Sequence, residues 1–197
     1  MPSQDRLAEY RRKRDPRTSR EPSGSGRTGA ARADSPRFVI QRHDASSLHF
    51  DFRLEVDGVL VSWAVPKGPS TNPRDKRFAT RTEDHPLDYL DFEGAIPEGE
   101  YGAGTVVVWD IGTYRNLTEH DGEPTPMGQA IESGHAKFWL DGEKLHGGYA
   151  LSKARLRGGE GWLLVKMDDE GADRRRKPTV TQPESVLTGR SNEDLET

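Results

Sequence analysis

One stretch of the sequence alternates between apolar side chains and side chains that can do chemistry. Over residues 48–56 every second position is apolar, and the positions between hold His49, Asp51, Arg53 and Glu55. A period of two is typical of a β-strand that buries one face and presents the other. Imidazole and carboxylate groups bind metals, and a guanidinium binds phosphate. The pattern therefore predicts a strand that carries a binding or catalytic site.

A second histidine precedes this strand. The run 38–43 is a predicted strand that ends at His43, and a short loop joins it to the 48–56 strand. His43, His49 and Asp51 then form a two-histidine, one-carboxylate set that can occupy one side of a metal and leave positions for water and substrate. Spacing alone does not select the metal, since the same set suits zinc. Three other histidines lie in turn-like contexts and are interpreted as hydrogen-bonded surface or core residues: His120, His135 and His146.

Cations in and near this strand extend the site toward a phosphate group. Arg53 continues the polar face, and Lys67 and Arg77 follow in the next segments. Guanidinium groups hold phosphate oxygens through paired hydrogen bonds. The alternative for Arg53 is a salt bridge to Glu55 or Glu83, and for Arg77 it is an ordinary solvated cation.

The segment E-D-H-P-L-D-Y supplies two further candidates. His85 can donate to the phosphate or protonate a leaving alkoxide, and Tyr89 can donate its hydroxyl to the same anion. The alternative for Tyr89 is packing on Pro86. Alternation in the preceding strand places five residues on one side: Arg77, Ala79, Arg81, Glu83 and His85.

The composition favours a mainly all-β fold. Only 31% of the 197 residues are hydrophobic, and 21 glycines and 13 prolines supply many turns. Seven or eight short strands at close spacing predict an antiparallel barrel or sandwich. Cysteine is absent, so any metal must be held by His, Asp, Glu or water. The strands are expected at 38–43, 48–56, 59–65, 76–83, 105–109, 137–140, 148–153 and 162–166.

The chain divides into three predicted parts. Residues 1–36 are a basic leader, with a short helix over 4–14 and a flexible linker over 22–36; residues 37–168 form the β domain, and residues 169–197 a flexible tail. The net charge is +5 over residues 1–37 and −9 over the rest, so a nucleic acid would have to bind local Arg and Lys clusters in a salt-sensitive way. No run is long and apolar enough to span a membrane and no signal peptide is present, which predicts a cytoplasmic protein.

Four blocks of sequence occur in a fixed order. They are F-V-I-Q-x-H-D-A with L-H-x-D-F-R-L-E (38–55), S-W-A-V-P-K-G-P (62–69), E-D-H-P-L-D-Y (83–89) and I-P-E-G-x-Y-G-A-G-T (96–105). This set strongly resembles the 3′-phosphoesterase domain of bacterial DNA ligase D. The resemblance covers roughly residues 10–166 and includes the leader motif Y-x-x-K-R-D with E-P at 21–22. Polymerase and ligase portions are absent, so the chain looks like a stand-alone member.

The resemblance implies a compact antiparallel β-barrel enzyme that heals the 3′ ends of DNA in non-homologous end joining. Such an enzyme removes a 3′-terminal ribonucleoside as a phosphodiesterase, then removes the remaining 3′-phosphate as a phosphomonoesterase to leave a 3′-OH. Manganese is the implied metal, with other divalent ions open. The implied partners are DNA or RNA-tipped DNA 3′ ends and separate end-joining ligase and polymerase proteins.

The resemblance also implies roles for individual residues. The metal ligands would be His43, His49 and Asp51. Both steps would use Arg53, His85 and Tyr89. The phosphomonoesterase step would mainly use Lys67, Arg77 and Glu83, and in the leader Arg14, Asp15 and Glu21. The leader departs from the family pattern, because Pro16 follows Asp15 and Ser19-Arg20 precede Glu21.

Two functions from other classes fit the sequence less fully. One is a catalytically weak DNA-end-binding scaffold that recruits a separate polymerase and ligase, which the basic leader and the missing partner domains favour. The other is a metal-barrel phosphatase that acts on small phosphate esters. Metal-dependent shortening of a primer with one 3′ ribonucleotide distinguishes the end-healing enzyme from the scaffold. Competition between substrates distinguishes it from the phosphatase.

Overall fold

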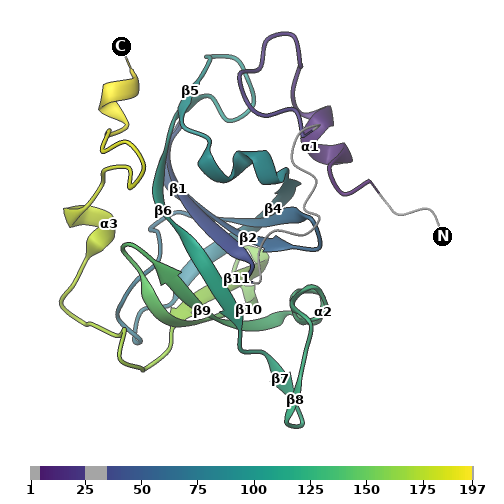
Figure 1. The fold of residues 1–197 in the computed structure, drawn as a ribbon, viewed down its shortest axis with the longest axis vertical. Coiled ribbons are helices and arrows are strands. Elements are labelled where there is room, and N and C mark those ends of the chain that lie inside the picture. Colours follow the sequence, from purple (N-terminus) through teal and green to yellow (C-terminus); the bar gives the residue numbers. More distant parts are fainter. Residues whose placement is uncertain (1–4, 25–34, 197) are drawn as a thin grey trace.

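Eight antiparallel strands close into a barrel in the computed structural model, which describes residues 5–24 and 35–196 (Figure 1). The predicted mainly all-β barrel is confirmed, whereas most of the predicted flexible linker lies outside the described residues. The short strand β5 (Gly94–Ile96) adds to the start of β6. Around the barrel the order is β1 (Arg37–Asp44), β2 (Leu48–Val56), β3 (Val59–Val65), β4 (Arg77–His85), β11 (Gly159–Lys166), β10 (His146–Leu156), β9 (His135–Gly142) and β6 (Gly104–Asn116), which pairs with β1.

Apolar and polar side chains alternate along the strands, and the apolar ones point inward and fill the barrel. On β2 the inward face is formed by Phe50, Phe52 and Leu54, which join one continuous interior cluster. The hairpin from β2 to β3 turns at Asp57 and Gly58, both with positive φ, as the Asp-Gly pair predicts. This turn and the apolar pattern together fix the register of β2 against β3 and decide which side chains face the interior.

The connection between β6 and β9 contains elements that the sequence analysis did not predict. A small hairpin, β7 (Glu119–His120) and β8 (Glu123–Pro124), is followed by helix α2 (Met127–Ser133). Side chains of α2 belong to the interior cluster of the barrel. Among the described residues, no helix has the length and apolar character needed to cross a membrane.

An extra residue in β4 changes which side chains face outward. Ser62 of β3 pairs with Thr82, but Leu60, two residues earlier, pairs with His85, three residues later. A bulge of this kind moves the residues on either side of it to opposite faces of the strand. Ala79 accordingly lies in the interior cluster, whereas His85 faces outward. The expectation that Arg77, Ala79, Arg81, Glu83 and His85 share one side is therefore wrong.

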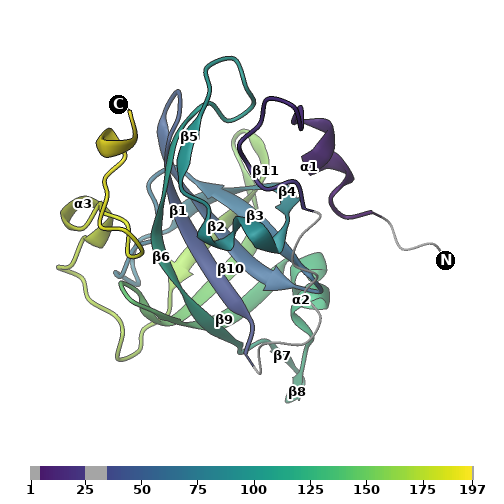
Figure 2. The same ribbon diagram turned by 45° about the horizontal axis from the view of Figure 1, so that its top comes forward.

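A second apolar cluster covers the outside of the barrel where β2 carries its polar residues. Helix α1 (Ala8–Arg12) lies against β4, and the 3-10 helix η1 (Leu87–Asp91) follows β4 directly (Figure 2). Tyr10 of α1 packs with Tyr89 of η1 and with Leu60. The middle of the polar face of β2, Asp51 and Arg53, is therefore buried beneath the leader and η1, while His49 and Glu55 at its ends are half-buried.

The residues after β11 run along the outside of the barrel, beside β6 and β1 (Figure 1). They include α3 (Pro178–Thr181) and η2 (Glu193–Leu195). Trp109 donates its indole N–H to the carbonyl of Gln182, and the fully buried Asn192 amide donates to the Thr105 carbonyl. These bonds fix the path of the segment over the barrel wall.

Candidate metal centre

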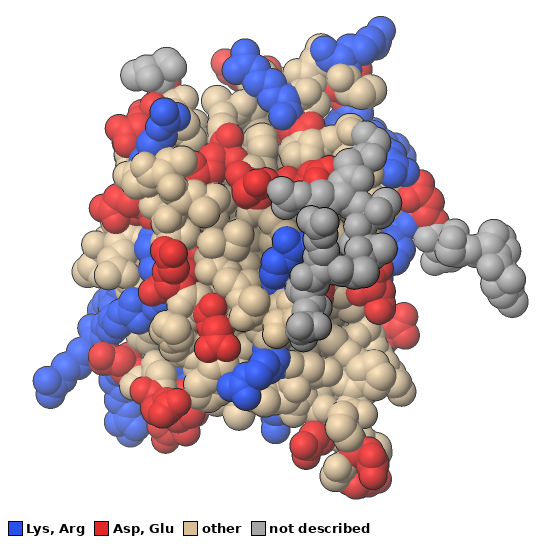
Figure 3. All heavy atoms as spheres, in the orientation of Figure 1, with Lys and Arg blue, Asp and Glu red and all other residues tan. Residues whose placement is uncertain are grey.

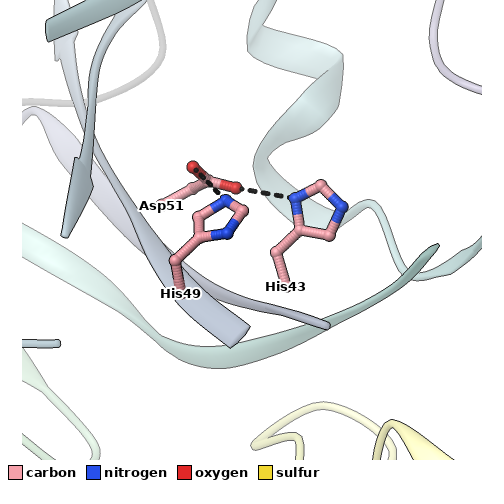
Figure 4. Close-up of side chains that lie close together, drawn as sticks. All are labelled: His43, His49 and Asp51. Carbon is pink, nitrogen blue, oxygen red and sulfur yellow. Dashed lines mark hydrogen bonds and ion pairs between the residues drawn. The ribbon is translucent and has the colours of Figure 1, made fainter. Parts of the chain in front are cut away.

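Strand pairing brings the three predicted metal ligands together. His43 on β1 lies directly opposite His49 on β2, and Gln41 lies opposite Asp51. Side chains that are opposite or diagonal across antiparallel strands are within contact distance. One ligand atom from each of the three predicted ligands lies within 4.8 Å of the others, and Figure 4 shows both imidazoles directed at the Asp51 carboxylate.

Each histidine has one ring nitrogen bound to a backbone carbonyl. His43 Nε2 lies 2.7 Å from the carbonyl oxygen of Gly102, and His49 Nδ1 lies 3.3 Å from that of Ser47. With a metal bound, protons on these nitrogens would leave His43 Nδ1 and His49 Nε2 with lone pairs for the metal; without a metal, the same two nitrogens can instead donate to Asp51. Metal-binding histidines are oriented by this kind of outer contact.

The spacing of the three groups fits a bound metal. His43 Nδ1 and His49 Nε2 lie 3.2 and 3.3 Å from the two carboxylate oxygens of Asp51. Metal–ligand bonds of about 2.1 Å place neighbouring donor atoms roughly 3.0–3.4 Å apart. The residues present can therefore supply donor atoms for a divalent cation.

Charge and burial have opposite effects on the pKa values of Asp51 and His49. Burial raises the pKa of the Asp51 carboxyl, but the charge of Arg53 and the hydrogen bonds from His43 and His49 outweigh it and hold the pKa well below its usual range. Burial likewise lowers the pKa of His49, and the hydrogen bond and charge of Asp51 outweigh it, so the net shift is upward. Asp51 is therefore an anion at neutral pH, as a metal ligand must be.

Arg53 is buried beside the metal ligands with its charge only partly matched. Its Nε donates to the Gln41 amide oxygen at 2.8 Å, and its Nη2 lies 3.6 Å from Asp51. Its guanidinium carbon lies 4.8 Å from the centre of the Tyr89 ring. Its Nη1 is buried and has no hydrogen-bond partner among the described residues, which is unusual for a charged donor. The alternative of a salt bridge to Glu55 is not realised, because Glu55 pairs with Arg37.

His85 is a neutral hydrogen-bond acceptor in this pocket. Its Nδ1 lies 2.9 Å from the carbonyl oxygen of Glu83, and its Nε2 lies 3.4 Å from Nη2 of Arg14, which can only donate. Burial, followed by the charges of Arg53 and Arg14, lowers the pKa of His85 well below the ordinary value. At neutral pH its Nε2 therefore accepts a proton before it can protonate a leaving group.

The depressed pKa of His85 predicts a pH-dependent stability. The unfolded chain protonates this histidine near pH 6.5, while the folded protein resists protonation, so stability falls as the pH drops from about 6.5 toward the lower folded pKa. In metal-free protein, His85→Asn keeps a donor for the Glu83 carbonyl and should flatten this part of the stability profile. Denaturant unfolding at pH 7.5, 6.5 and 5.5 measures it. Parallel profiles for the two proteins would contradict the assignment.

The leader supplies two charged residues to the pocket. Arg14 Nε donates to Glu21 Oε2 at 2.9 Å, and Arg14 Nη1 donates to Glu83 Oε1 at 3.3 Å. Its guanidinium lies 3.8 Å from the centre of the Tyr10 ring. Tyr89 donates its hydroxyl to the other oxygen of Glu21 at 2.7 Å. The altered leader motif therefore still docks, with Glu21 and Glu83 on either side of Arg14.

We predict that Glu21→Gln releases the leader. Loss of one charge from a buried ion pair typically costs on the order of 3 kcal/mol, and Glu21 is 9% exposed. Trypsin should then cut the leader near Arg14 much faster than in the wild type. Asp15→Asn is the matched control, because the Asp15 side chain is 40% exposed and, among the described residues, its ion pair is with the nearby Arg17. Equal cleavage rates in the two variants would show that Glu21 does not hold the leader.

The structure gathers nine of the twelve predicted site residues around one cavity of about 240 Å³. Lys67 and Arg77 instead line a separate groove, and Asp15 lies at the surface. The nine residues are Arg14, Glu21, His43, His49, Asp51, Arg53, Glu83, His85 and Tyr89.

Three residues that contact the predicted site residues were missed: Gln41 behind the pocket, and Tyr101 and Gly102 in its wall. Gln41 is fully buried and positions Arg53, while its amide donates to the carbonyls of Tyr89 and Phe92. Its place two residues before His43 on the same strand was an available signal. Tyr101 and the Gly102 carbonyl come from the 96–105 block, which indicates the family but does not reveal that this turn approaches His43.

The geometry agrees with comparisons to known proteins. A model of the DNA ligase D 3′-phosphoesterase domain matches residues 41–153. The chain belongs to the DNA ligase D 3′-phosphoesterase family. The multifunctional non-homologous end joining protein LigD of Pseudomonas aeruginosa is 50% identical over 197 residues, which cover 97% of this chain and 22% of that protein. A LigD protein of Mycobacterium tuberculosis is 45% identical over 169 residues, 86% of this chain and 21% of its own length.

Family membership identifies the domain as a phosphoesterase of the DNA ligase D type. The chain spans about a fifth of the length of the relatives it matches. Its matched segment contains the three predicted metal ligands, Arg53 and His85. The pocket therefore lies within the phosphoesterase domain.

Proposed function

We propose that this domain heals the 3′ ends of DNA in end-joining repair. It removes a 3′-terminal ribonucleoside by hydrolysing the bond between phosphorus and the ribonucleoside's 5′ oxygen. It then removes the remaining 3′-phosphate and leaves a 3′-OH. Its substrates are DNA or RNA-tipped DNA 3′ ends, and separate end-joining ligase and polymerase proteins would act on the product.

One observation carries this proposal: a cluster of two histidines and one aspartate that could hold a metal stands next to an arginine with an unpaired nitrogen. Asp51 and the two histidines provide the metal site, and Arg53 follows on the same strand face. Hydrolysis of phosphate esters needs charge stabilisation on the phosphate oxygens, and a metal with a guanidinium supplies it. A scaffold that only bound ends would not need a buried metal triad.

Each side chain then has a defined task. A divalent cation held by His43, His49 and Asp51 would polarise a phosphate oxygen. Arg53 would donate to another oxygen of the same phosphate. His85 Nε2 would take a proton from the attacking water and return it to the leaving oxygen. Tyr89 keeps its proton, since burial and the Glu21 charge raise its pKa well above the ordinary value.

Manganese is the metal that we propose. Its preference for carboxylate oxygen, combined with two imidazoles, matches the donor set, although zinc and other divalent ions bind similar groups. Activity measured with Mn²⁺, Zn²⁺ and Mg²⁺ in turn, after removal of bound metal with a chelator, identifies the productive ion.

The test uses the purified protein and a primer–template that carries one 3′ ribonucleotide. Manganese-dependent shortening to a 3′-phosphate, followed by conversion to a 3′-OH, is expected. Substrates that end in 3′-phosphate, and a truncation without residues 1–36, separate the second step from the first. End binding without shortening would favour the scaffold alternative.

A further inference from the structure

A second and larger cavity lies at the end of β2 away from the turn at Asp57. This basic groove has a volume of about 670 Å³. Its apolar lining includes Leu48 and Val180, which are 39% and 73% exposed. Five cations line it: Lys67, Arg77, Arg174, Arg176 and Lys177.

The charge of the basic groove contrasts with that of the whole chain. The protein carries a net charge of −4, whereas Asp75 is the one carboxylate among the described residues that line the groove. Asp75 lies 3.6 Å from Arg77, and the other four cations have no carboxylate partner within the part of the chain that is described. Figure 3 shows Lys and Arg side chains at the lower left, over the segment that leads into α3. A group of five lining cations with one lining carboxylate attracts a polyanion.

The backbone that carries three of the cations is held in place. Thr71, which is 2% exposed, donates its hydroxyl to the carbonyls of Asp173 and Arg176, and the Asp173 N–H donates to the Thr71 carbonyl. The Asp173 carboxylate accepts from the N–H groups of Arg175 and Arg176. The 173–177 segment is therefore tied to the β3–β4 connection, and its cations are presented at a fixed position.

The basic groove and the metal pocket share strand β2. Leu48 and Phe50 line the groove, and His49 and Asp51 line the pocket. Because successive side chains of a strand point to opposite faces, the groove and the pocket lie on opposite faces of β2, both near the start of this strand. A ligand that occupies both must pass around the start of β2, which needs a chain of several nucleotides.

We propose that the basic groove holds backbone phosphates of the DNA whose 3′ end lies in the metal pocket. The volume and the spread of five cations exceed what one phosphate needs, and the exposed apolar residues suit the sugars between phosphates. The position of the reacting end rests on the proposed function, whereas the affinity of the groove for nucleic acid does not. Lys67 and Arg77 then contact the backbone instead of the reacting phosphate.

The test replaces three groove cations together, in Arg174→Gln/Arg176→Gln/Lys177→Gln. Each lost phosphate contact lowers the slope of log affinity against log salt by about 1. For a 20-base-pair primer–template, the slope should fall by about 2–3 and the affinity by roughly 10–100-fold at 0.1 M salt. Fluorescence anisotropy across a salt series measures both. Cleavage of the long substrate should fall more than cleavage of a dinucleotide, which cannot reach the groove.

A double variant, Arg155→Gln/Arg157→Gln, is the control for loss of charge. Both residues are exposed near the β10–β11 turn and do not line the groove. Each of three results would overturn the proposal. They are an unchanged salt slope in the triple variant, an equal loss of DNA affinity in the control variant, and a wild type that does not bind DNA. An inactive wild type that still binds DNA through the groove would contradict the proposed function alone. An acidic peptide that binds the groove as tightly as the DNA does would assign the groove to a protein partner and overturn the proposal.

Discussion

His49→Ala should abolish metal-dependent cleavage. The variant removes one of three ligands, so its affinity for Mn²⁺ should fall by more than the roughly 10–100-fold that loss of an outer-sphere partner costs. A metal contributes several kcal/mol of charge stabilisation, so the cleavage rate should drop by about 10³-fold or more. Titration calorimetry with Mn²⁺ and a primer-shortening assay measure the two effects.

The fold should survive this change. The His49 side chain is 21% exposed, and its contacts are with Ser47, Asp51 and the His43 ring rather than with the core. His146→Ala is the control, because His146 is an exposed histidine on β10 outside the pocket. Unchanged Mn²⁺ affinity in His49→Ala would remove this residue from the metal site.

Arg53→Gln should separate catalysis from metal binding. It removes the guanidinium that lies beside the metal ligands but leaves all three ligands in place. Loss of one charge-stabilising donor typically costs about 10²–10³-fold in rate, so kcat should fall by that factor while Mn²⁺ still binds. Steady-state kinetics and Mn²⁺ titration on the same preparations provide the comparison.

Arg53 is also buried, so stability must be measured with activity. Removing one partner of a buried charge pair typically costs about 3–5 kcal/mol, and Asp51 loses its closest permanent cation in this variant. Arg37→Gln is the control, since Arg37 forms an ion pair with Glu55 on the same two strands but outside the pocket. Wild-type kcat in a folded Arg53→Gln variant would exclude Arg53 from the reaction.

The metal site could be predicted because it depends on local pairing. His49 and Asp51 are two residues apart on one strand, and a short loop places His43 opposite His49. Antiparallel register follows from the loop length and the apolar pattern. The spacing of the three ligands is therefore encoded in fewer than ten residues.

Arg77 shows where strand periodicity fails. It was grouped with His85 because both occupy odd positions, but the bulge in β4 places them on opposite sides. A single extra residue in a strand leaves no clear mark in an alternating sequence. The groove that receives Arg77 also needs the distant 174–177 segment, which only folding brings alongside.

By itself, the sequence determined the β-rich class and the family and predicted the three metal ligands, since each depends on residue types at short spacing. Tertiary structure alone decided that the middle of the polar face of β2 is buried, because the leader and η1 fold over it from outside the barrel. It also decided the low pKa of His85 and the high pKa of Tyr89, which arise mainly from burial. Contacts such as Arg14–Glu83 join residues 69 positions apart, and no local pattern specifies them.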